Sequence, residues 1–424
     1  MMRLKPFHIL ALALLAIGLF MIVYPAEGTA AAMRGIVIWW DVLFPALFPF
    51  LVIAEMMLGL GLVHFIGMLL DPLMRPLFRV PGIGGFVMAM GFASGYPVAA
   101  RLTSQLWDQK LVNREEGERL VAFATTSDPI FMIGAVSVGF FHDVRLAVVL
   151  ASAHYGSAVL LGLLMRFHGR DKKAGYEAAA RSAIVGRKRS KTSPSLLKRA
   201  LHAMHEARLR DGRALGTMLN QAVKIAIQLI MVIGGLVVFF SVVLEAMRIT
   251  HLMEYVSIAI GSLLGLFGLP QPLAAAIING MFEVTLGAKA AGAGGAAIPL
   301  AYKAAVCAFV LSWAGLSVHA QIVSLLYRTP FRYTPFALAR VLHGFLSAGA
   351  VLLLWDWLKP AQAPDLTAFA PFAKTASPSL LGWGASLPAS LLLLAAICAG
   401  LLALAIGVAT FKRIRSLIGK HFFS

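Results

Sequence analysis

Charged residues are scarce in this sequence. Asp, Glu, Lys and Arg make up 13% of its 424 residues, whereas soluble domains carry about 25%. Acidic residues are the rarest of them, with 19 Asp and Glu against 37 Lys and Arg. The two cysteines, Cys307 and Cys398, lie in separate apolar segments and are too few for a disulfide framework. Because 59% of the residues are hydrophobic and the mean hydropathy is +0.82, the composition predicts a polytopic membrane protein.

Motifs for cofactor and metal chemistry are also missing. The sequence has no Walker A loop, no HExxH and no GxSxG, and the run HAMHE in the basic loop has the wrong order for a zinc helix. We therefore predict no catalytic residue, no cofactor and no metal site. A membrane enzyme is the alternative, because Ser127, Asp128 and His154 include the residue types of a hydrolytic triad.

The excess of positive charge is concentrated in one loop. Between Arg170 and Arg213 the chain has thirteen Lys or Arg against four Asp or Glu. The positive-inside rule places such a loop in the cytoplasm, and an amphipathic helix around residues 196–209 would suit an anionic lipid surface. Since no aromatic interleaving or nucleic-acid motif accompanies the charge, we predict no nucleic-acid partner. A structural or signalling protein that docks through this loop is a further alternative.

Apolar runs long enough to cross a bilayer give the topology. Two further runs, 83–106 and 272–300, are interrupted by Gly and Pro and predict re-entrant hairpins, while His64–Val80 predicts an interfacial helix. With both hairpins returning to their own side, the basic segments and both termini fall on the cytoplasmic side. The eight predicted spans are 7–24, 37–62, 119–140, 144–167, 218–245, 303–326, 337–357 and 388–411.

A repeat relates the two halves of the chain. An offset of 189 residues superposes Pro81 on Pro270, Gly91 on Gly280 and His154 on His343. Because the halves start from opposite sides of the membrane, they are inverted repeats, an architecture of many secondary transporters. The fold class is thus an all-α polytopic membrane protein with about eight transmembrane helices and two re-entrant hairpins. Its predicted units are an N-terminal helix (1–36), repeat 1 (37–167), a basic cytoplasmic loop (168–217), repeat 2 (218–357), an external loop (358–387) and a C-terminal helix with a basic tail (388–424).

The stretch GFASGYPVAARL, residues 91–102, marks the first predicted site. Lipid does not tolerate an unpaired backbone, so a broken helix survives only where protein or a water-filled cavity covers it. Pro97 can open a second half-helix, Ser94 can cap its N–H groups, and Arg101 follows one turn later near the positive end of the helix dipole. The arrangement favours an anion, whereas the alternative is a simple kink for close packing.

Polar residues interrupt three other apolar stretches: 125–129 (TTSDP), 279–287 in the second hairpin, and 312–319, the repeat equivalent of the TTSDP break. Asp128 in the run TTSDP is either a site residue or a cap, and Glu283 either faces a substrate or pairs with Lys289. His154 and His343 are predicted to be hydrogen-bonded packing residues, and the alternative is that they carry protons. The predicted substrate-binding residues are Ser94, Gly95, Tyr96, Arg101, Ser127, Asp128, Asn279, Glu283, Thr285, Ser312 and Ser317.

Three runs carry a family resemblance: FPALFPFLVIAEMMLGLG, DPLMRPLFRVPGIGGFVMAMGFASGYPVAARLTSQL and ERLVAFATTSDPIFMIGAVSVGFFHDVRLAVVLASAHY. They closely resemble the YlbJ or SpoVV family of sporulation integral membrane proteins. These carry the nucleoside-recognition or Gate domain, which is similar to the core of concentrative nucleoside transporters. The resemblance covers about 36–167 strongly and 218–357 more loosely. At two positions the chain departs from the family, which has an amide residue in place of Tyr96 and Asn in place of Asp128.

The resemblance implies a role in endospore formation: moving dipicolinic acid through the outer forespore membrane. It also implies a small-molecule substrate, a lipid bilayer and sporulation membrane partners. Whether a coupling ion takes part is left open. Dipicolinate is a planar aromatic dianion that half-helix N-termini with Arg101 nearby would suit, and Tyr96 or Trp313 could stack on its ring. Asp128 and Glu283 oppose an anion unless they are protonated, paired or bound to a cation. A nucleoside or other small-solute carrier is the alternative within transport.

Overall fold

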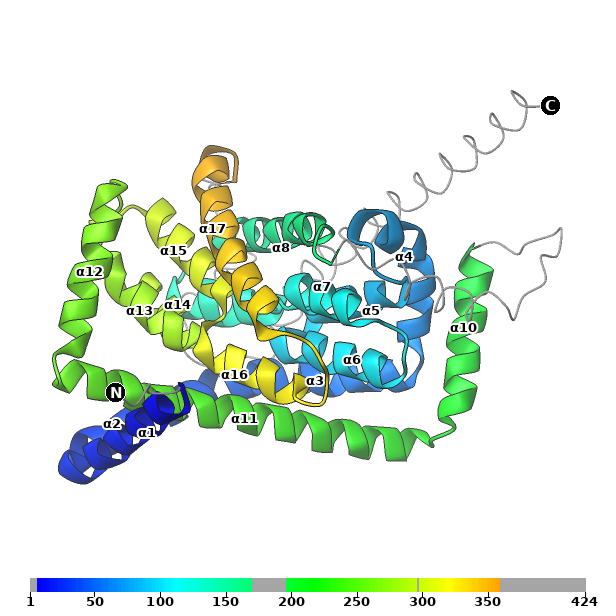
Figure 1. The fold of residues 1–424 in the computed structure, drawn as a ribbon, viewed down its shortest axis with the longest axis horizontal. Helices are drawn as coiled ribbons and strands as arrows, with labels where there is room; N and C mark the ends of the chain where they lie inside the picture. The colour runs from blue at the N-terminus through cyan, green and yellow to red at the C-terminus, as the bar shows by residue number, and fades with distance from the viewer. Residues whose placement is uncertain (1–5, 170–195, 296, 359–424) are drawn as a thin grey trace, which may run out of the picture.

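The computed structural model describes residues 6–169, 196–295 and 297–358, and this part of the chain is built from helices without a strand. The all-helical class is therefore confirmed. The predicted C-terminal span 388–411, the external loop from 359 onward and most of the basic loop lie outside the described residues. Figure 1 shows α11 (Leu215–Ile249) along one edge of the molecule, between α10 (Leu196–Asp211) at one end and α12 (Leu252–Leu266) at the other.

The N-terminal part has a helix where the sequence predicted a gap between the spans 7–24 and 37–62. Helix α1 spans Pro6–Val23, and after a bend of 109° the chain continues directly as α2, Pro25–Ile38, which the sequence did not predict. Pro25 explains the new start, because proline is favoured at the first positions of a helix. A π-helical turn, η1 (Trp39–Leu43), leads into α3 (Phe44–Gly59).

Repeat 1 contains the two predicted breaks. The first hairpin consists of α5 and α6, which meet at Gly95, and the predicted span 119–140 is interrupted by the non-helical residues 125–128. The helix predicted for His64–Val80 is present as α4, with its apolar face packed on α5, and its interfacial position stays a prediction. The elements are α4 (Leu62–Phe78), α5 (Ile83–Ser94), α6 (Tyr96–Asp108), α7 (Arg114–Ala124), the π-helix η2 (Phe131–Phe140) and α8 (Leu146–Met165).

Repeat 2 has the same order of elements. Helix α12 was not predicted, yet it lies at the 189-residue offset from α4. The second hairpin breaks at Glu283 and the following span breaks at Ala314, the positions equivalent to Ser94 and Thr125. After α12 come the 3-10 turn η3 (Gln271–Leu273), α13 (Ala274–Phe282), α14 (Val284–Gly292), α15 (Leu300–Trp313), α16 (Gly315–Leu326) and α17 (Tyr333–Leu358).

The two repeats meet through equivalent elements. Helices α8 and α17 pack together, and His343 Nε2 donates to the carbonyl of His154 at 2.9 Å with the two ring centroids 4.8 Å apart. Contact between equivalent positions is what a pair related by a twofold axis makes at that axis. The repeat proposed from the 189-residue offset therefore has a structural counterpart in the element order and in this contact.

Length and composition limit the number of spans. In the described residues, four helices are long and apolar enough to cross a membrane, and three bent helix pairs raise the total to at most seven. The four are Leu146–Met165, Leu215–Ile249, Leu300–Leu326 and Tyr333–Trp357. These correspond to four predicted spans, of which the third is broken at Ala314.

Candidate functional site

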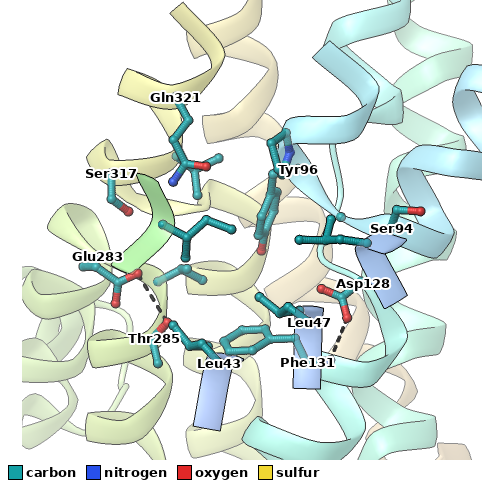
Figure 2. Close-up of a pocket in the computed structure, with 16 residues that line it drawn as sticks. Leu43, Leu47, Ser94, Tyr96, Asp128, Phe131, Glu283, Thr285, Ser317 and Gln321 are labelled. Atoms are coloured by element: carbon teal, nitrogen blue, oxygen red, sulfur yellow. Dashed lines mark hydrogen bonds between the residues drawn. The ribbon is translucent and has the colours of Figure 1, made fainter. Parts of the chain in front are cut away.

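Four half-helices begin at one central cavity, which we call cavity 1. Its volume is about 50 Å³, and in the view of Figure 2 Glu283 and Asp128 lie on opposite sides with the Tyr96 hydroxyl between them. The starts of α6, η2, α14 and α16 all contribute to its wall. It is lined by Leu43, Leu47, Leu51, Ser94, Gly95, Tyr96, Pro97, Asp128, Phe131, Ile233, Glu283, Val284, Thr285, Ser317, Val318 and Gln321.

The first break is shaped by Gly95. Its φ of +85° is a conformation that favours glycine, and a Cβ there would lie 3.2 Å from an Asp128 carboxylate oxygen. Tyr96 is fixed beside it because its hydroxyl donates to the carbonyl of Leu311 at 2.7 Å. The predicted capping role of Ser94 is wrong: Gly95 is the N-cap of α6, and the buried Ser94 hydroxyl has no hydrogen-bond partner. The cause is that Ser94 still belongs to α5, so its side chain leaves from the preceding helix.

Two buried carboxylates cap half-helices at the cavity wall. Asp128 Oδ1 accepts from the Phe131 amide at 2.8 Å, which confirms its predicted capping geometry. Glu283 accepts from the Leu286 amide at 2.8 Å and from the Thr285 hydroxyl at 3.3 Å, so it caps α14 instead of pairing with Lys289. Each carboxylate is thereby held against the positive end of a helix dipole.

The other two half-helices begin without a side-chain cap. Helix α6 starts after Gly95, and α16 starts at Gly315 after its N-cap Ala314; the φ values of Ala314 and Gly315 are +74° and +76°. Near the start of α16 the buried hydroxyl of Ser317 has no partner, like that of Ser94. Free amide groups and the positive dipole end make such a helix start suited to an anion. Two helix starts without a side-chain cap therefore face cavity 1.

His154 is held by the backbone and by a serine behind the cavity. Its Nε2 accepts from the Ser127 amide at 3.0 Å, so its Nδ1 carries the proton and donates to Ser312 Oγ at 2.8 Å. The Ser127 hydroxyl is buried without a partner. Because no hydrogen bond joins that hydroxyl to the imidazole, Ser127, Asp128 and His154 do not form the relay of a hydrolytic triad.

The sequence analysis missed Arg340, although it is the largest wholly buried side chain in the described residues. From α17 it donates to the carbonyls of Ala122 and Thr125 at the end of α7, and to that of Ser312 at 3.4 Å. A guanidinium at helix C-termini complements both the free carbonyls and the negative dipole end. The available signal was an arginine inside the apolar run 337–357, since an intramembrane charge indicates a special role.

The structure brings together most of the predicted site residues but not all. Arg101 lies apart from cavity 1, because it forms an ion pair with Glu55 and lines a second, larger cavity. Ser127 and Ser312 lie behind the wall around His154, and Asn279 is half-buried in α13 without lining cavity 1. The predicted residues that do line it are Ser94, Gly95, Tyr96, Asp128, Glu283, Thr285 and Ser317.

The fold and the cavity define an integral membrane protein whose half-helices meet at a central site. The family model described as "Gate: Nucleoside recognition" matches residues 41–169. The chain is 41% identical over 344 residues to the sporulation integral membrane protein YlbJ of Bacillus subtilis (strain 168), which covers 80% of this chain and 81% of that protein. The chain therefore belongs to the YlbJ family of sporulation integral membrane proteins. Among solved structures, a CNTnw variant in an outward-facing state gives a TM-score of 0.45 at 13% identity over 84% of this chain and 88% of that one.

Proposed function

We propose that this protein is a transporter that moves dipicolinate, a small aromatic dianion, across the outer forespore membrane. The observation that carries the proposal is the pair of uncapped half-helix starts, α6 and α16, at the wall of cavity 1. Amide groups there would bind one carboxylate each, with the unpartnered hydroxyls of Ser94 and Ser317 close to the same ends. The family relationship to a sporulation membrane protein supports the cellular setting.

The rest of the cavity wall carries side chains that pack on a flat aromatic ring, and the cavity, at about 50 Å³, would have to widen to admit one. Tyr96 and Phe131 supply aromatic faces, and leucines of α3 and the preceding turn supply apolar contact. The two carboxylates of the wall are each bonded to the amide groups of the half-helix that they cap. Their charge is therefore offset locally, which leaves the field of the α6 and α16 starts available to the substrate.

Transport would proceed by alternating access between the two repeats. The half-helices that form cavity 1 come from both repeats, with α6 and η2 from the first and α14 and α16 from the second. A movement of one repeat against the other would expose the site to one side at a time. We also propose that a coupling ion takes part and that both termini lie in the cytoplasm.

A nucleoside carrier is the second candidate. The description of the matching family model favours it, and the side-chain amide of Gln321 in the cavity wall offers both a donor and an acceptor for a base edge. A neutral nucleoside would not require the two uncapped helix starts.

Uptake into proteoliposomes tests the proposal directly. Purified full-length protein is reconstituted and supplied with labelled dipicolinate or labelled uridine, with protein-free liposomes as the control. We expect saturable uptake of dipicolinate that excess uridine does not inhibit. Uptake of uridine alone would replace the proposed substrate with a nucleoside, and uptake of neither by folded protein would overturn the transporter function.

A further inference from the structure

A second cavity, which we call cavity 2, lies beside the Arg101–Glu55 pair. Its volume is about 520 Å³, and it is walled by α3, α5, α6 and the segment that joins α10 to α11. Its charged groups have both signs. They are Glu55, Asp108, Asp211, Arg101 and Arg213, with His64 at the start of α4.

The two cavities follow one another along shared helices. On α3, Leu51 lines cavity 1 and Glu55, one turn later, lines cavity 2. On α6, Pro97 lines cavity 1 and Arg101, again one turn later, lines cavity 2. One turn of four residues advances a helix by about 6 Å, so the boundary between the cavities is thin. Helix α11 also contributes to both walls, so the two cavities are neighbours along three shared helices.

The ion pair between Arg101 and Glu55 stands at this boundary. It joins α6 to α3, and the side chains are only 22% and 12% exposed. The other arginine of cavity 2, Arg213, is held by Asp211 and Gln221. Among the described residues that line cavity 1 there is no cation, so Arg101 is the positive group that a carboxylate would meet one turn before that cavity.

We propose that Arg101 selects carboxylate substrates at the boundary between the two cavities, and that Glu55 occupies it as an internal carboxylate until the substrate displaces it. A guanidinium binds carboxylates in a fixed fork, so one carboxylate can replace another without a change of geometry. Glu55 also keeps the charge of Arg101 compensated in the empty protein, because an unpaired buried charge is costly. This inference rests on the proposed function. It places the discrimination between carboxylate and uncharged substrates outside cavity 1.

Binding of two matched ligands to the full-length protein tests the inference. The ligands are dipicolinate and its uncharged diamide, which has the same ring and nearly the same shape, and the measurement is isothermal titration calorimetry in detergent. We expect the wild type to prefer the dicarboxylate, and Arg101→Gln to lose roughly 10- to 100-fold of that preference, since a hydrogen bond to a charged group contributes about 1.5–3 kcal/mol. Arg145→Gln is the control, because Arg145 forms an exposed ion pair with Asp143 and lines neither cavity.

Glu55→Gln provides an independent test that does not depend on the folding of the Arg101 variant. Without the internal carboxylate, dipicolinate should bind roughly 3- to 10-fold more tightly, while affinity for the diamide stays unchanged. A purely structural ion pair predicts no gain in Glu55→Gln and an unchanged preference in Arg101→Gln, and either result overturns the inference. If the wild type binds dipicolinate but no better than its diamide, this inference fails alone. If the wild type does not bind dipicolinate at all, the proposed function fails and this inference fails with it.

Discussion

At the scale of single residues, Arg340 resolves the problem that broken helices create. A helix that stops inside a membrane leaves free carbonyl groups, and the hydrocarbon core supplies no hydrogen-bond donor for them. The guanidinium has five donors in a rigid fork, and in this structure it reaches carbonyls from α7 and α15 at once. One side chain of repeat 2 therefore closes the break in repeat 1.

We expect Arg340→Lys to destabilise the protein strongly. A lysine ammonium cannot reproduce the fork, and each buried acceptor left without a partner costs about 1–3 kcal/mol. The check is the thermal unfolding midpoint in detergent, which should fall by roughly 5 °C or more. Arg328→Lys is the matched control, because Arg328 is exposed beside Tyr327. Equal midpoints for both variants would show that Arg340 does not hold the break together.

Ser317 permits a test of cavity 1 that leaves stability intact. Its hydroxyl is buried without a partner, so Ser317→Ala removes no hydrogen bond of the empty protein. If the hydroxyl binds a substrate carboxylate, dipicolinate uptake at low concentration should fall by roughly 3- to 10-fold. Ser324→Ala, an exposed position on the same helix, should leave uptake unchanged. Equal uptake by the two variants would remove Ser317 from the substrate site.

At the scale of elements, the hairpins depend on close backbone approach. A Cβ on Gly91 in α5 would lie 2.1 Å from the carbonyl oxygen of Ala124 in α7, and a Cβ on Gly280 in α13 would lie 2.3 Å from the side chain of Val310 in α15. These glycines are equivalent in the repeat and serve the same purpose, since each lets a hairpin pack against the broken helix of its own half. Small residues at helix crossings are typical of packing inside membranes.

Gly91→Ala should therefore disturb the first hairpin. Its methyl group meets backbone, which cannot rotate away, so we expect a loss of about 1–3 kcal/mol. The thermal midpoint should fall by several degrees relative to Gly134→Ala, because a Cβ on Gly134 meets no atom within 4 Å. A Gly91→Ala protein as stable as the control would mean that α5 and α7 can move apart without loss of folding free energy.

At the scale of the whole molecule, Glu118 ties the two repeats together outside the membrane-spanning segments. Its carboxylate accepts from the Arg332 amide at 2.9 Å and from the Arg332 guanidinium at 2.9 and 2.8 Å, and it also contacts His168 at 2.6 Å and Arg114 at 3.1 Å. Burial alone would raise the pKa of Glu118, but the hydrogen bonds from Arg332, His168 and Arg114 outweigh it. They hold the pKa at about 2, below the usual 4.5.

This depressed pKa predicts how acid acts on the assembled molecule. Above pH 4.5 the carboxylate is ionised in both folded and unfolded protein, and its stabilising contribution is complete. As the pH falls from 4.5 towards about 2, the unfolded state takes up a proton first, so the contribution is lost. Thermal midpoints measured through this window should fall more steeply in the wild type than in Glu118→Gln. Glu254→Gln, an exposed site, should follow the wild type, and parallel curves for all three would disprove the linkage.

The sequence predicts the broken elements well because their cause is local. Glycine, proline and capping residues inside apolar runs predict the breaks at Gly95, Asp128, Glu283 and Ala314 without reference to the rest of the chain. In contrast, which side chain binds which group depends on residues that are distant in the sequence. The carbonyls of Ala122 and Thr125 that bind Arg340 lie more than 200 positions away along the chain, and nothing in the sequence places Glu55 opposite Arg101. Helix α12 was missed because 15 residues are too few for a span, although its repeat partner α4 implied it.

The two equivalent histidines do not make reciprocal bonds. His343 donates to the carbonyl of His154, whereas the ring of His154 is engaged by Ser127 and Ser312. A perfectly symmetric pair would return the same bond from each side. Here the surroundings of the two rings differ, because the 189-residue offset puts Leu316 at the position of Ser127 and Phe123 at the position of Ser312. Nitrogen chemical shifts of the two rings should therefore differ, since both ring nitrogens of His154 are hydrogen-bonded whereas His343 Nδ1 has no partner.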